Sequence, residues 1–152
     1  MLKVKIAIVM GSQSDFETMN EAVNLLKEFK VGYEVRVLSA HRTPRDVAKF
    51  SEEARKNGIK VIIAGAGGAA ALAGVIAAHT TLPVIGVPIE TSSLKGMDSL
   101  LSTVQMPGGV PVASMAIGKV GAKNAAIFAL EILGAADKDI EKKLAGYKKK
   151  PD

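Results

Sequence analysis

A histidine and an arginine stand side by side in the segment Ser39-Ala40-His41-Arg42, and both residue types are suited to a small anionic molecule. Histidine gains and loses a proton near neutral pH, which makes His41 the leading candidate for a general acid and base. The planar guanidinium of Arg42 can bind a phosphate or a carboxylate, and the Ser39 hydroxyl can add a further hydrogen bond. The alternative is an exposed turn before a well-capped helix.

A second polar segment, residues 11–15 (Gly-Ser-Gln-Ser-Asp), follows the first apolar run of the chain. Hydroxyls and free backbone N–H groups at a helix start are typical of a phosphate site, and Asp15 could accept hydrogen bonds from the hydroxyls of a sugar. Part of the pattern has a structural explanation, because Ser14 and Glu17 have the spacing of a helix capping box. The phosphate-binding loop of ATPases, Gly-x-x-x-x-Gly-Lys-Ser/Thr, does not occur, so the use of ATP is unsupported.

A glycine-rich segment, residues 65–70 (Gly-Ala-Gly-Gly-Ala-Ala), follows a later apolar run and precedes a helix-like stretch. It matches the Gly-x-Gly-x-x-Ala form of the dinucleotide fingerprint. The usual fingerprint follows the first strand of its unit, whereas this segment follows the third, and Glu90 falls in a loop. We therefore interpret the segment as a place where the backbone approaches a small ligand closely.

Other kinds of site lack the necessary residues. The chain has no cysteine, which excludes disulfides, thiolate nucleophiles and iron–sulfur clusters. The second histidine, His79, lies near the end of an Ala-rich helix, where the helix dipole explains it. No His-x-x-x-His pair or acidic cluster suggests a metal site, and no Gly-x-Ser-x-Gly elbow suggests a serine hydrolase. We predict that no metal is bound.

Composition limits the partners. The 152 residues carry 20 Lys and Arg against 15 Asp and Glu, a net charge of +5, and 48% are hydrophobic, which suffices for one core. No apolar run of about 18 residues and no signal peptide is found, so we expect a soluble, cytoplasmic protein without a membrane partner. Six of the Lys residues fall in the tail, 137–152, and only 4% of residues are aromatic, which disfavours nucleic-acid binding.

Apolar β-rich runs alternate with amphipathic stretches along the chain. The predicted strands span 3–10, 31–38, 59–64, 83–87 and 110–117. The predicted helices run from Ser14 to before Gly32, over 43–58, 69–79, 98–104 and 122–133, and over about 137–147. In the second helix, Thr43 is predicted to be the N-cap and Pro44 the first helical residue.

This alternation predicts a three-layer αβα sandwich, in which helices cover both faces of a doubly wound, parallel, five-stranded sheet. We expect residues 1–152 to form one domain. In such sheets, ligands bind beyond the carboxyl ends of the strands. The segments 11–15, 39–44, 65–71 and 88–96 should therefore converge on a single site.

The last predicted helix, about 137–147, offers only Ile140, Leu144 and Tyr147 as an apolar stripe. The stripe can pack on its own domain or cross to a neighbouring subunit. Because the Ala- and Gly-rich helices permit close approach, we favour a homo-oligomer.

Four segments together resemble one family: Gly11-Ser-x-Ser-Asp15, Ser39-Ala-His-Arg-Thr-Pro44, Ala64-Gly-Ala-Gly-Gly-Ala-Ala70 and Asp98-Ser-Leu-Leu-Ser-x-Val-Gln-Met-Pro107. They look like the N5-carboxyaminoimidazole ribonucleotide mutases (class I) of purine biosynthesis, and the likeness runs from about Val4 to Leu133. The resemblance implies a flavodoxin-like sandwich that assembles as an octamer. It also implies an ATP-independent isomerase that uses neither a metal nor an organic cofactor.

The resemblance also assigns roles to residues. His41 would shuttle the proton, Asp15 would bind the ribose, and Arg42 with the serines would bind the phosphate of a small ribonucleotide substrate. The residues that we expect to line the site, besides His41, are Gly11, Ser12, Ser14, Asp15, Ser39, Ala40, Arg42, Ala66, Gly67, Gly68, Ala69 and Leu72.

The chain departs from the family after Gly68, where Ala-Ala-His-Leu-Pro-Gly is usual and Ala71 and Ala73 replace the His and the Pro. A related class that carboxylates aminoimidazole ribonucleotide directly generally has Lys where Arg42 stands, so Arg42 favours the mutase. Two alternatives are a flavin- or NAD-binding regulatory module and a purely structural subunit. A structural subunit would not explain why polar residues gather with His41 at one edge of the sheet.

Overall fold

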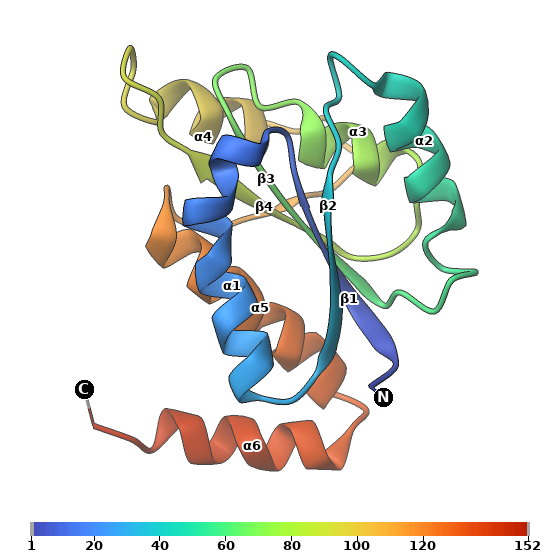
Figure 1. Ribbon diagram of the computed structural model, residues 1–152, viewed down its shortest axis with the longest axis vertical. Coiled ribbons are helices and arrows are strands. Elements are labelled where there is room, and N and C mark those ends of the chain that lie inside the picture. The colour runs from blue at the N-terminus through green and yellow to red at the C-terminus, as the bar shows by residue number, and fades with distance from the viewer. Residues whose placement is uncertain (1, 152) are drawn as a thin grey trace.

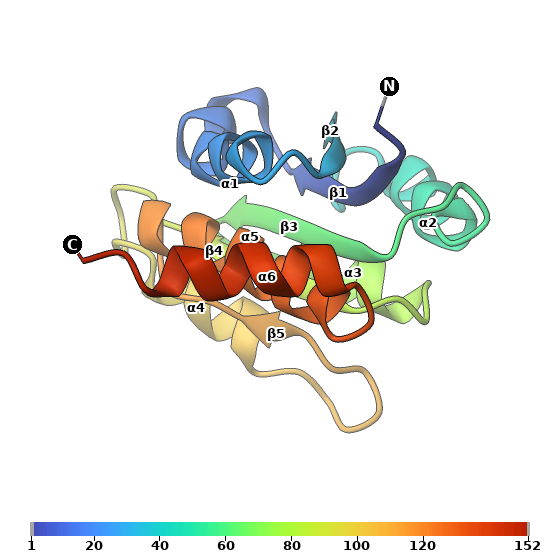
Figure 2. The ribbon, with the colours of Figure 1, turned by 90° about the horizontal axis from the view of Figure 1, so that it is seen from below.

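The fold is a parallel sheet between two layers of helices (Figures 1 and 2). The computed structural model describes residues 2–151, in which five parallel strands run in the order β2-β1-β3-β4-β5. That order is the flavodoxin-like one of doubly wound sheets, whose order reverses between β1 and β3. The predicted fold class is therefore confirmed.

The elements follow the predicted alternation. The strands are β1 (Val4–Met10), β2 (Gly32–Val37), β3 (Val61–Gly67), β4 (Val84–Ile89) and β5 (Ala113–Ser114). The helices are a short 3-10 turn (Gln13–Asp15), α1 (Phe16–Glu28), α2 (Pro44–Glu53), α3 (Leu72–Ala78), α4 (Met97–Val104), α5 (Lys119–Gly134) and α6 (Lys138–Lys148).

The central strands are buried on both faces, and alternate residues of β1 face opposite layers. Ile6, Ile8 and Met10 pack in the core under α1 and α5, whereas Ala7 and Val9 pack in the core under α2 and α3. All five side chains are fully buried. This two-sided burial is the reason that the strands read as continuous apolar runs.

The second helix is shorter than predicted, and the third strand is longer. Helix α2 ends at Glu53, and a turn follows up to Gly58, whose φ of +88° suits glycine. Strand β3 continues to Gly67 because it pairs with β4 from Ile62 to Gly67. Helix α3 accordingly begins only at Leu72, after the left-handed Gly68, instead of at residue 69.

The fifth strand is much shorter than the predicted 110–117. Only Ala113 and Ser114 pair regularly with β4. Pro111 has no N–H to donate, and the segment around it lies at the edge of the sheet. Beyond Ser114, the N–H groups of Met115 and Gly118 still donate to the carbonyls of Gly86 and Pro88, so the segment follows β4 without a regular ladder.

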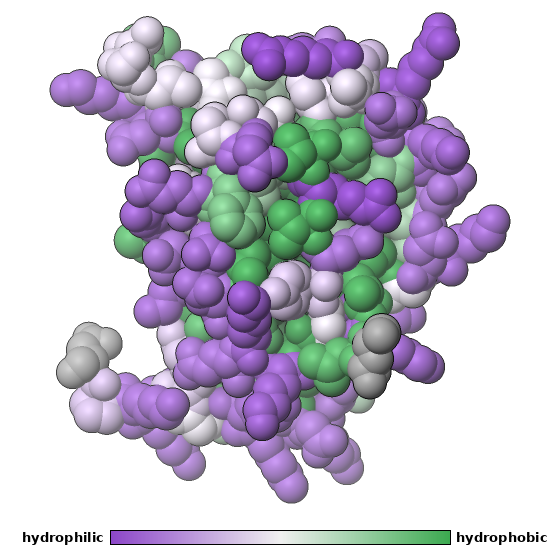
Figure 3. Space-filling view, viewed as in Figure 1, coloured by the Kyte–Doolittle hydropathy of each residue, from purple (hydrophilic) through white to green (hydrophobic). Residues whose placement is uncertain are grey.

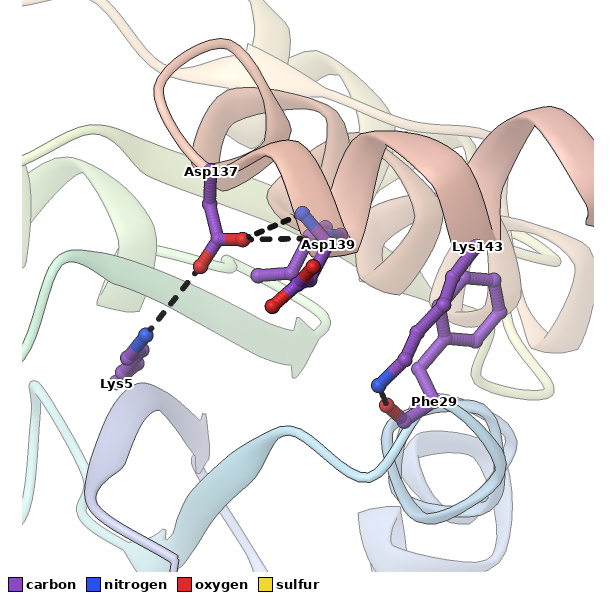
Figure 4. Close-up of polar contacts among 6 residues, drawn as sticks. Lys5, Phe29, Asp137, Asp139 and Lys143 are labelled. Carbon is purple, nitrogen blue, oxygen red and sulfur yellow. Dashed lines mark hydrogen bonds and ion pairs between the residues drawn. The ribbon is translucent and has the colours of Figure 1, made fainter.

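Helix α6 lies at the amino end of the sheet (Figure 1), and Figure 4 shows the polar contacts that hold it there. Asp137 caps its N-terminus through the N–H groups of Asp139 and Ile140, and its carboxylate lies 3.7 Å from Nζ of Lys5. Nζ of Lys143 donates to the Phe29 carbonyl at 2.9 Å. In the single chain, the apolar stripe of α6 is therefore covered by the chain's own residues after α1 and in α5.

The surface differs between the middle and the end of the molecule. Figure 3 shows the face with β2, the edge strand of the sheet, and hydrophobic side chains gather in its middle, while the lower end over α6 is hydrophilic. Val35 and Val37 of β2 are both exposed. Between residues 2 and 151, no helix has both the length and the apolar character that crossing a lipid bilayer requires.

Candidate active site

One cavity of about 290 Å³ lies beyond the carboxyl ends of the strands, where the loops after β1, β2, β3 and β4 meet. This is the place where doubly wound sheets bind ligands, and the volume is near the lower end for small-molecule sites, about 300–1,000 Å³. The cavity is lined by Gly11, Ser12, Ser14, Asp15, Ser39, Ala40, His41, Arg42, Ala66, Gly67, Ala69, Ala71, Leu72 and Thr91. Every predicted site residue except Gly68 is among them.

The loop after β1 is held by its own hydrogen bonds. The Ser12 N–H donates to Oδ2 of Asp15 at 3.1 Å, and the Ser14 N–H donates to Oγ of Ser12 at 3.3 Å. The prediction that Ser14 and Glu17 form the capping box is therefore wrong: Ser12 and Asp15 form it, because a 3-10 turn precedes α1.

This cap limits what the loop can offer to a phosphate. The N–H groups of Gly11, Ser12, Ser14 and Asp15 all donate within the chain, so they are not free donors. The hydroxyls of Ser12 and Ser14, whose oxygens are 3.0 Å apart, are the groups left at the cavity wall. These four amides are therefore not available to a phosphate, and the hydroxyls and Arg42 remain as side-chain donors at the cavity.

Asp15 is half-buried at the cavity wall. Burial raises the pKa of its carboxyl above the ordinary value of 3.8, and the hydrogen bond from the Ser12 N–H opposes that shift in part. The carboxylate thus pays a desolvation cost in the folded chain that a hydroxyl-rich ligand would relieve.

The loop after β2 presents His41 and Arg42 at the cavity. Both side chains are exposed, and within residues 2–151 neither makes a hydrogen bond or an ion pair. The backbone of the same loop is fixed, because the Arg42 N–H donates to Oγ of Ser39 and the Thr43 N–H donates to the Ser39 carbonyl.

The glycine-rich end of β3 and the residues that follow it line part of the cavity. A Cβ on Gly65 would collide with the buried Met19 side chain, and one on Gly67 would lie 3.1 Å from the Ile89 carbonyl and from Thr91. The missing side chains therefore let three segments approach one another. Gly68 has a φ of +61° and turns the chain toward α3 without lining the cavity.

Two lining residues, Ala71 and Thr91, were not among the predicted site residues. Ala71 stands where the resembling family has histidine, and its methyl group leaves that part of the wall apolar. Thr91 lies two residues after the end of β4, so its position in the loop 88–96 was a usable signal. A threonine in a loop has many structural uses, so the residue type alone did not mark Thr91 as a site residue.

The second histidine lies away from this cavity. His79 follows α3 as predicted, and its Nδ1 lies 3.3 Å from Oε1 of Glu52 on the neighbouring α2. Among residues 2–151, no three His, Cys, Asp or Glu side chains are grouped in a way that could hold a metal ion.

The sheet order and the cavity define a class: a doubly wound α/β protein with a small-molecule site at the switch point of its sheet, where a histidine and an arginine are exposed to a ligand. Comparison with known proteins narrows the class. The family described as AIR carboxylase matches residues 5–152, and the chain belongs to this family.

Curated relatives share the name that the sequence motifs suggested. The N5-carboxyaminoimidazole ribonucleotide mutase of Bacillus subtilis is 60% identical over 139 residues, 91% of this chain and 86% of the relative. The enzymes of the same name from Saccharolobus solfataricus and Escherichia coli are 57% and 52% identical, over 94% and 95% of this chain and 89% and 86% of theirs. The resemblance to this family is thereby confirmed.

A solved structure supports the same fold. The crystal structure of Treponema denticola PurE is similar with a TM-score of 0.85 and 30% sequence identity, and the match covers 94% of this chain and 88% of that chain.

Proposed function

We propose that the chain is an isomerase that converts N5-carboxyaminoimidazole ribonucleotide to 4-carboxy-5-aminoimidazole ribonucleotide in de novo purine (IMP) biosynthesis. The observation that carries the proposal is the gathering of His41 and Arg42 with Ser12 and Asp15 around one cavity, in a chain whose curated relatives bear the mutase name. This chemistry needs an acid–base group beside an anion site, and the cavity offers both.

The substrate would be bound by its polar ends. Arg42 and the hydroxyls of Ser12 and Ser14 take the phosphate, since the N–H groups of Ser12, Ser14 and Asp15 already donate within the chain. The Asp15 carboxylate accepts hydrogen bonds from the ribose hydroxyls, which replaces the water that burial removes from it. The imidazole ring then lies against the small residues of the glycine loop.

His41 would move one proton out and one proton back. Protonated His41 donates to the exocyclic nitrogen as the bond between that nitrogen and the carboxylate breaks, which releases carbon dioxide and leaves an amino group. The ring carbon attacks the carbon dioxide, and a carbon–carbon bond forms. Neutral His41 then removes the hydrogen from that ring carbon, so the ring regains its aromaticity and His41 returns to its starting state.

The proton and electron balance closes within the substrate and His41. We therefore infer that the reaction needs no ATP, no metal and no organic cofactor. Retaining the carbon dioxide is essential, because recombination is fast only while both fragments are held together. The small lining residues Gly67, Ala69 and Ala71 support this role, since they permit close contact with the ring.

We further infer that the chain works in the cytoplasm as a homo-oligomer, with the octamer implied by the resemblance. An apolar row that begins before α4 and continues along it supports the oligomer, because residues three or four apart share one face. Its members are Leu94, Met97, Leu101 and Val104, which are 60%, 54%, 54% and 46% exposed in the single chain. Light scattering of the purified protein measures the mass directly.

The test of the reaction is an ultraviolet assay of purified protein with freshly made N5-carboxyaminoimidazole ribonucleotide, without ATP or added bicarbonate. The parent should form the ring-carboxylated product. His41→Asn should lose about 10²- to 10⁴-fold in kcat, the usual contribution of general acid–base catalysis, and still bind the product in calorimetry.

The other outcomes separate the alternatives. A fully active His41→Asn variant would remove His41 from the mechanism. Conversion of aminoimidazole ribonucleotide and carbon dioxide, but not of the carbamate, would identify a direct carboxylase. Inactivity with both substrates would favour the ligand-binding module.

A further inference from the structure

The hydroxyl of Thr43 is used differently from the way the sequence predicts. Thr43 is the N-cap residue of α2 by position, with Pro44 as the first helical residue, yet its side chain makes no hydrogen bond to an amide of that helix. The predicted side-chain cap is therefore absent. The hydroxyl turns back along the chain toward the loop after β2.

There the hydroxyl makes two hydrogen bonds to one residue. Oγ1 of Thr43 accepts from the Ser39 N–H at 3.1 Å and donates to the Ser39 carbonyl at 3.1 Å. The Thr43 N–H donates to the same carbonyl at 2.9 Å, and the Arg42 N–H donates to Oγ of Ser39 at 3.1 Å. Ser39 and Thr43 are thus joined at the base of a five-residue loop, an arrangement that we call the Ser39–Thr43 clamp.

The clamp connects the cavity to the sheet. Just before the clamp, the Leu38 N–H donates to the carbonyl of Met10, the last residue of β1, at 2.9 Å. Just after it, the N–H of Val47 in α2 donates to the Thr43 carbonyl. His41 and Arg42 lie between the two ends of the clamp and have exposed side chains. Their backbone position therefore depends on the clamp more than on any contact of their own side chains.

We propose that Thr43 is a positioning residue, which fixes His41 and Arg42 at the cavity through the hydrogen bonds of its hydroxyl to Ser39. The proposal rests on the proposed function, in which His41 moves the proton. Proton transfer requires a heavy-atom approach within hydrogen-bond reach, and a displacement of about 1 Å costs about 10²-fold in rate. A hydroxyl with only a structural use in α2 would affect stability alone.

Two matched substitutions test the hydroxyl. Thr43→Val keeps the shape of the side chain and removes both hydrogen bonds, whereas Thr43→Ser keeps the hydroxyl and removes a methyl group. We expect Thr43→Val to lose about 10- to 100-fold in kcat at saturating substrate. The upper value corresponds to a displacement of His41 by about 1 Å. Thr43→Ser should restore most of the rate, and the thermal unfolding midpoints should show that both variants are folded at the assay temperature.

Hydrogen–deuterium exchange of the peptide that spans residues 38–43, followed by mass spectrometry, gives a readout independent of turnover. The Ser39 N–H loses its acceptor in Thr43→Val and should exchange faster, while Thr43→Ser should exchange like the parent. Unchanged exchange in Thr43→Val overturns the clamp.

The activities then decide the positioning role. An active parent with a Thr43→Val variant of equal kcat overturns the proposal and leaves the proposed function intact, and so does a Thr43→Ser variant as slow as Thr43→Val. A parent that converts no N5-carboxyaminoimidazole ribonucleotide overturns the proposed function first, and the positioning role with it.

Discussion

The two ends of the sheet use their polar side chains in opposite ways. At the amino end, lysines meet acceptors in the chain: Lys5 pairs with Asp137, Lys148 with Glu131, Lys150 with Glu28, and Lys143 with the Phe29 carbonyl. At the carboxyl end, His41 and Arg42 have no such partner within residues 2–151.

The difference lies in what the hydrogen bonds hold. At the amino end they join α6 to the body of the domain (Figure 4), so side chains connect distant segments. At the carboxyl end most are short-range bonds, such as Ser12 to Asp15 and Ser39 to Thr43, which fix the backbone and leave His41 and Arg42 free. The exposed pair of Lys119 and Glu17, 3.4 Å apart, is an exception, since it joins the starts of α5 and α1. The amino end should therefore determine stability, and the carboxyl end ligand binding and turnover.

The sharpest test of this division is Phe29→Ala at the amino end. Phe29 is 4% exposed, and its ring packs against Tyr147 with centroids 5.5 Å apart. Loss of the buried ring should lower the free energy of unfolding by about 3–5 kcal/mol, as for other buried aromatic residues. Denaturant unfolding measures the loss, and kcat and KM measured well below the unfolding midpoint should match the parent. Phe29→Leu, which keeps much of the buried volume, should lose clearly less.

The matching test at the other end is Arg42→Ala. Loss of a hydrogen-bonded charge on the substrate phosphate costs about 1.5–3 kcal/mol of binding, so KM should rise about 10- to 100-fold. The unfolding midpoint should stay at the parent value, because the guanidinium is exposed and pairs with no residue between 2 and 151. Arg42→Lys keeps the charge without the planar fork and should fall between the two. A parental KM in Arg42→Ala would contradict the division.

The sequence was most informative where local patterns decide the structure. The apolar runs of β1 and β3 and the helical spacing of α1 follow from burial that is regular along the chain. These elements form where they were predicted, although β3 extends beyond the predicted residue 64 to Gly67. The loops after those strands carry the candidate site because the carboxyl ends of parallel strands share one edge.

The sequence was least informative where distant segments decide the structure. The length of β5 depends on its pairing with β4, and two residues pair where eight were predicted to be extended. Two overlapping capping patterns occur near Ser12 and Ser14, and the 3-10 turn before α1 selects the earlier one. The backward turn of the Thr43 hydroxyl has the same origin, since Ser39 becomes its partner only when the loop after β2 closes.

A third prediction concerns the stability cost of the site itself. Burial raises the pKa of Asp15, so the ionised carboxylate is less favourable in the folded chain than in the unfolded chain. This cost is fully present above the folded-state pKa, and it disappears as pH falls below the unfolded value of 3.8. Asp15→Asn should therefore unfold at a slightly higher temperature than the parent at neutral pH, and the gain should shrink in acid.

The same substitution should weaken substrate binding, because an amide is a poorer acceptor for ribose hydroxyls than a carboxylate. In the parent, KM should begin to rise in acid at a higher pH than an ordinary aspartate would cause, since protonation removes the acceptor. A stability gain without a rise in KM would place Asp15 outside the binding site, and a loss of stability at neutral pH would contradict the effect of burial.

The smallest effect is expected from Asp137 at the amino end. Its pKa is shifted down, whereas the pKa of Asp15 is shifted up. Hydrogen bonds from the Ile140 and Asp139 N–H groups, with Lys5 nearby, hold the pKa of Asp137 below 3.8 despite partial desolvation. A lowered folded-state pKa stabilises the protein above the unfolded value, and this contribution is lost as pH falls through the folded-state pKa. Asp137→Asn keeps an acceptor for the helix and removes the charge, whereas Asp137→Ala removes both, so the alanine variant should unfold at the lower temperature. In acid, the loss of stability in Asp137→Asn should vanish, because only the charge is missing. The loss in Asp137→Ala should shrink but persist, because the acceptor is missing too. Equal unfolding midpoints for the parent and Asp137→Ala at neutral pH would mean that α6 is held by Phe29 and Tyr147 rather than by its cap.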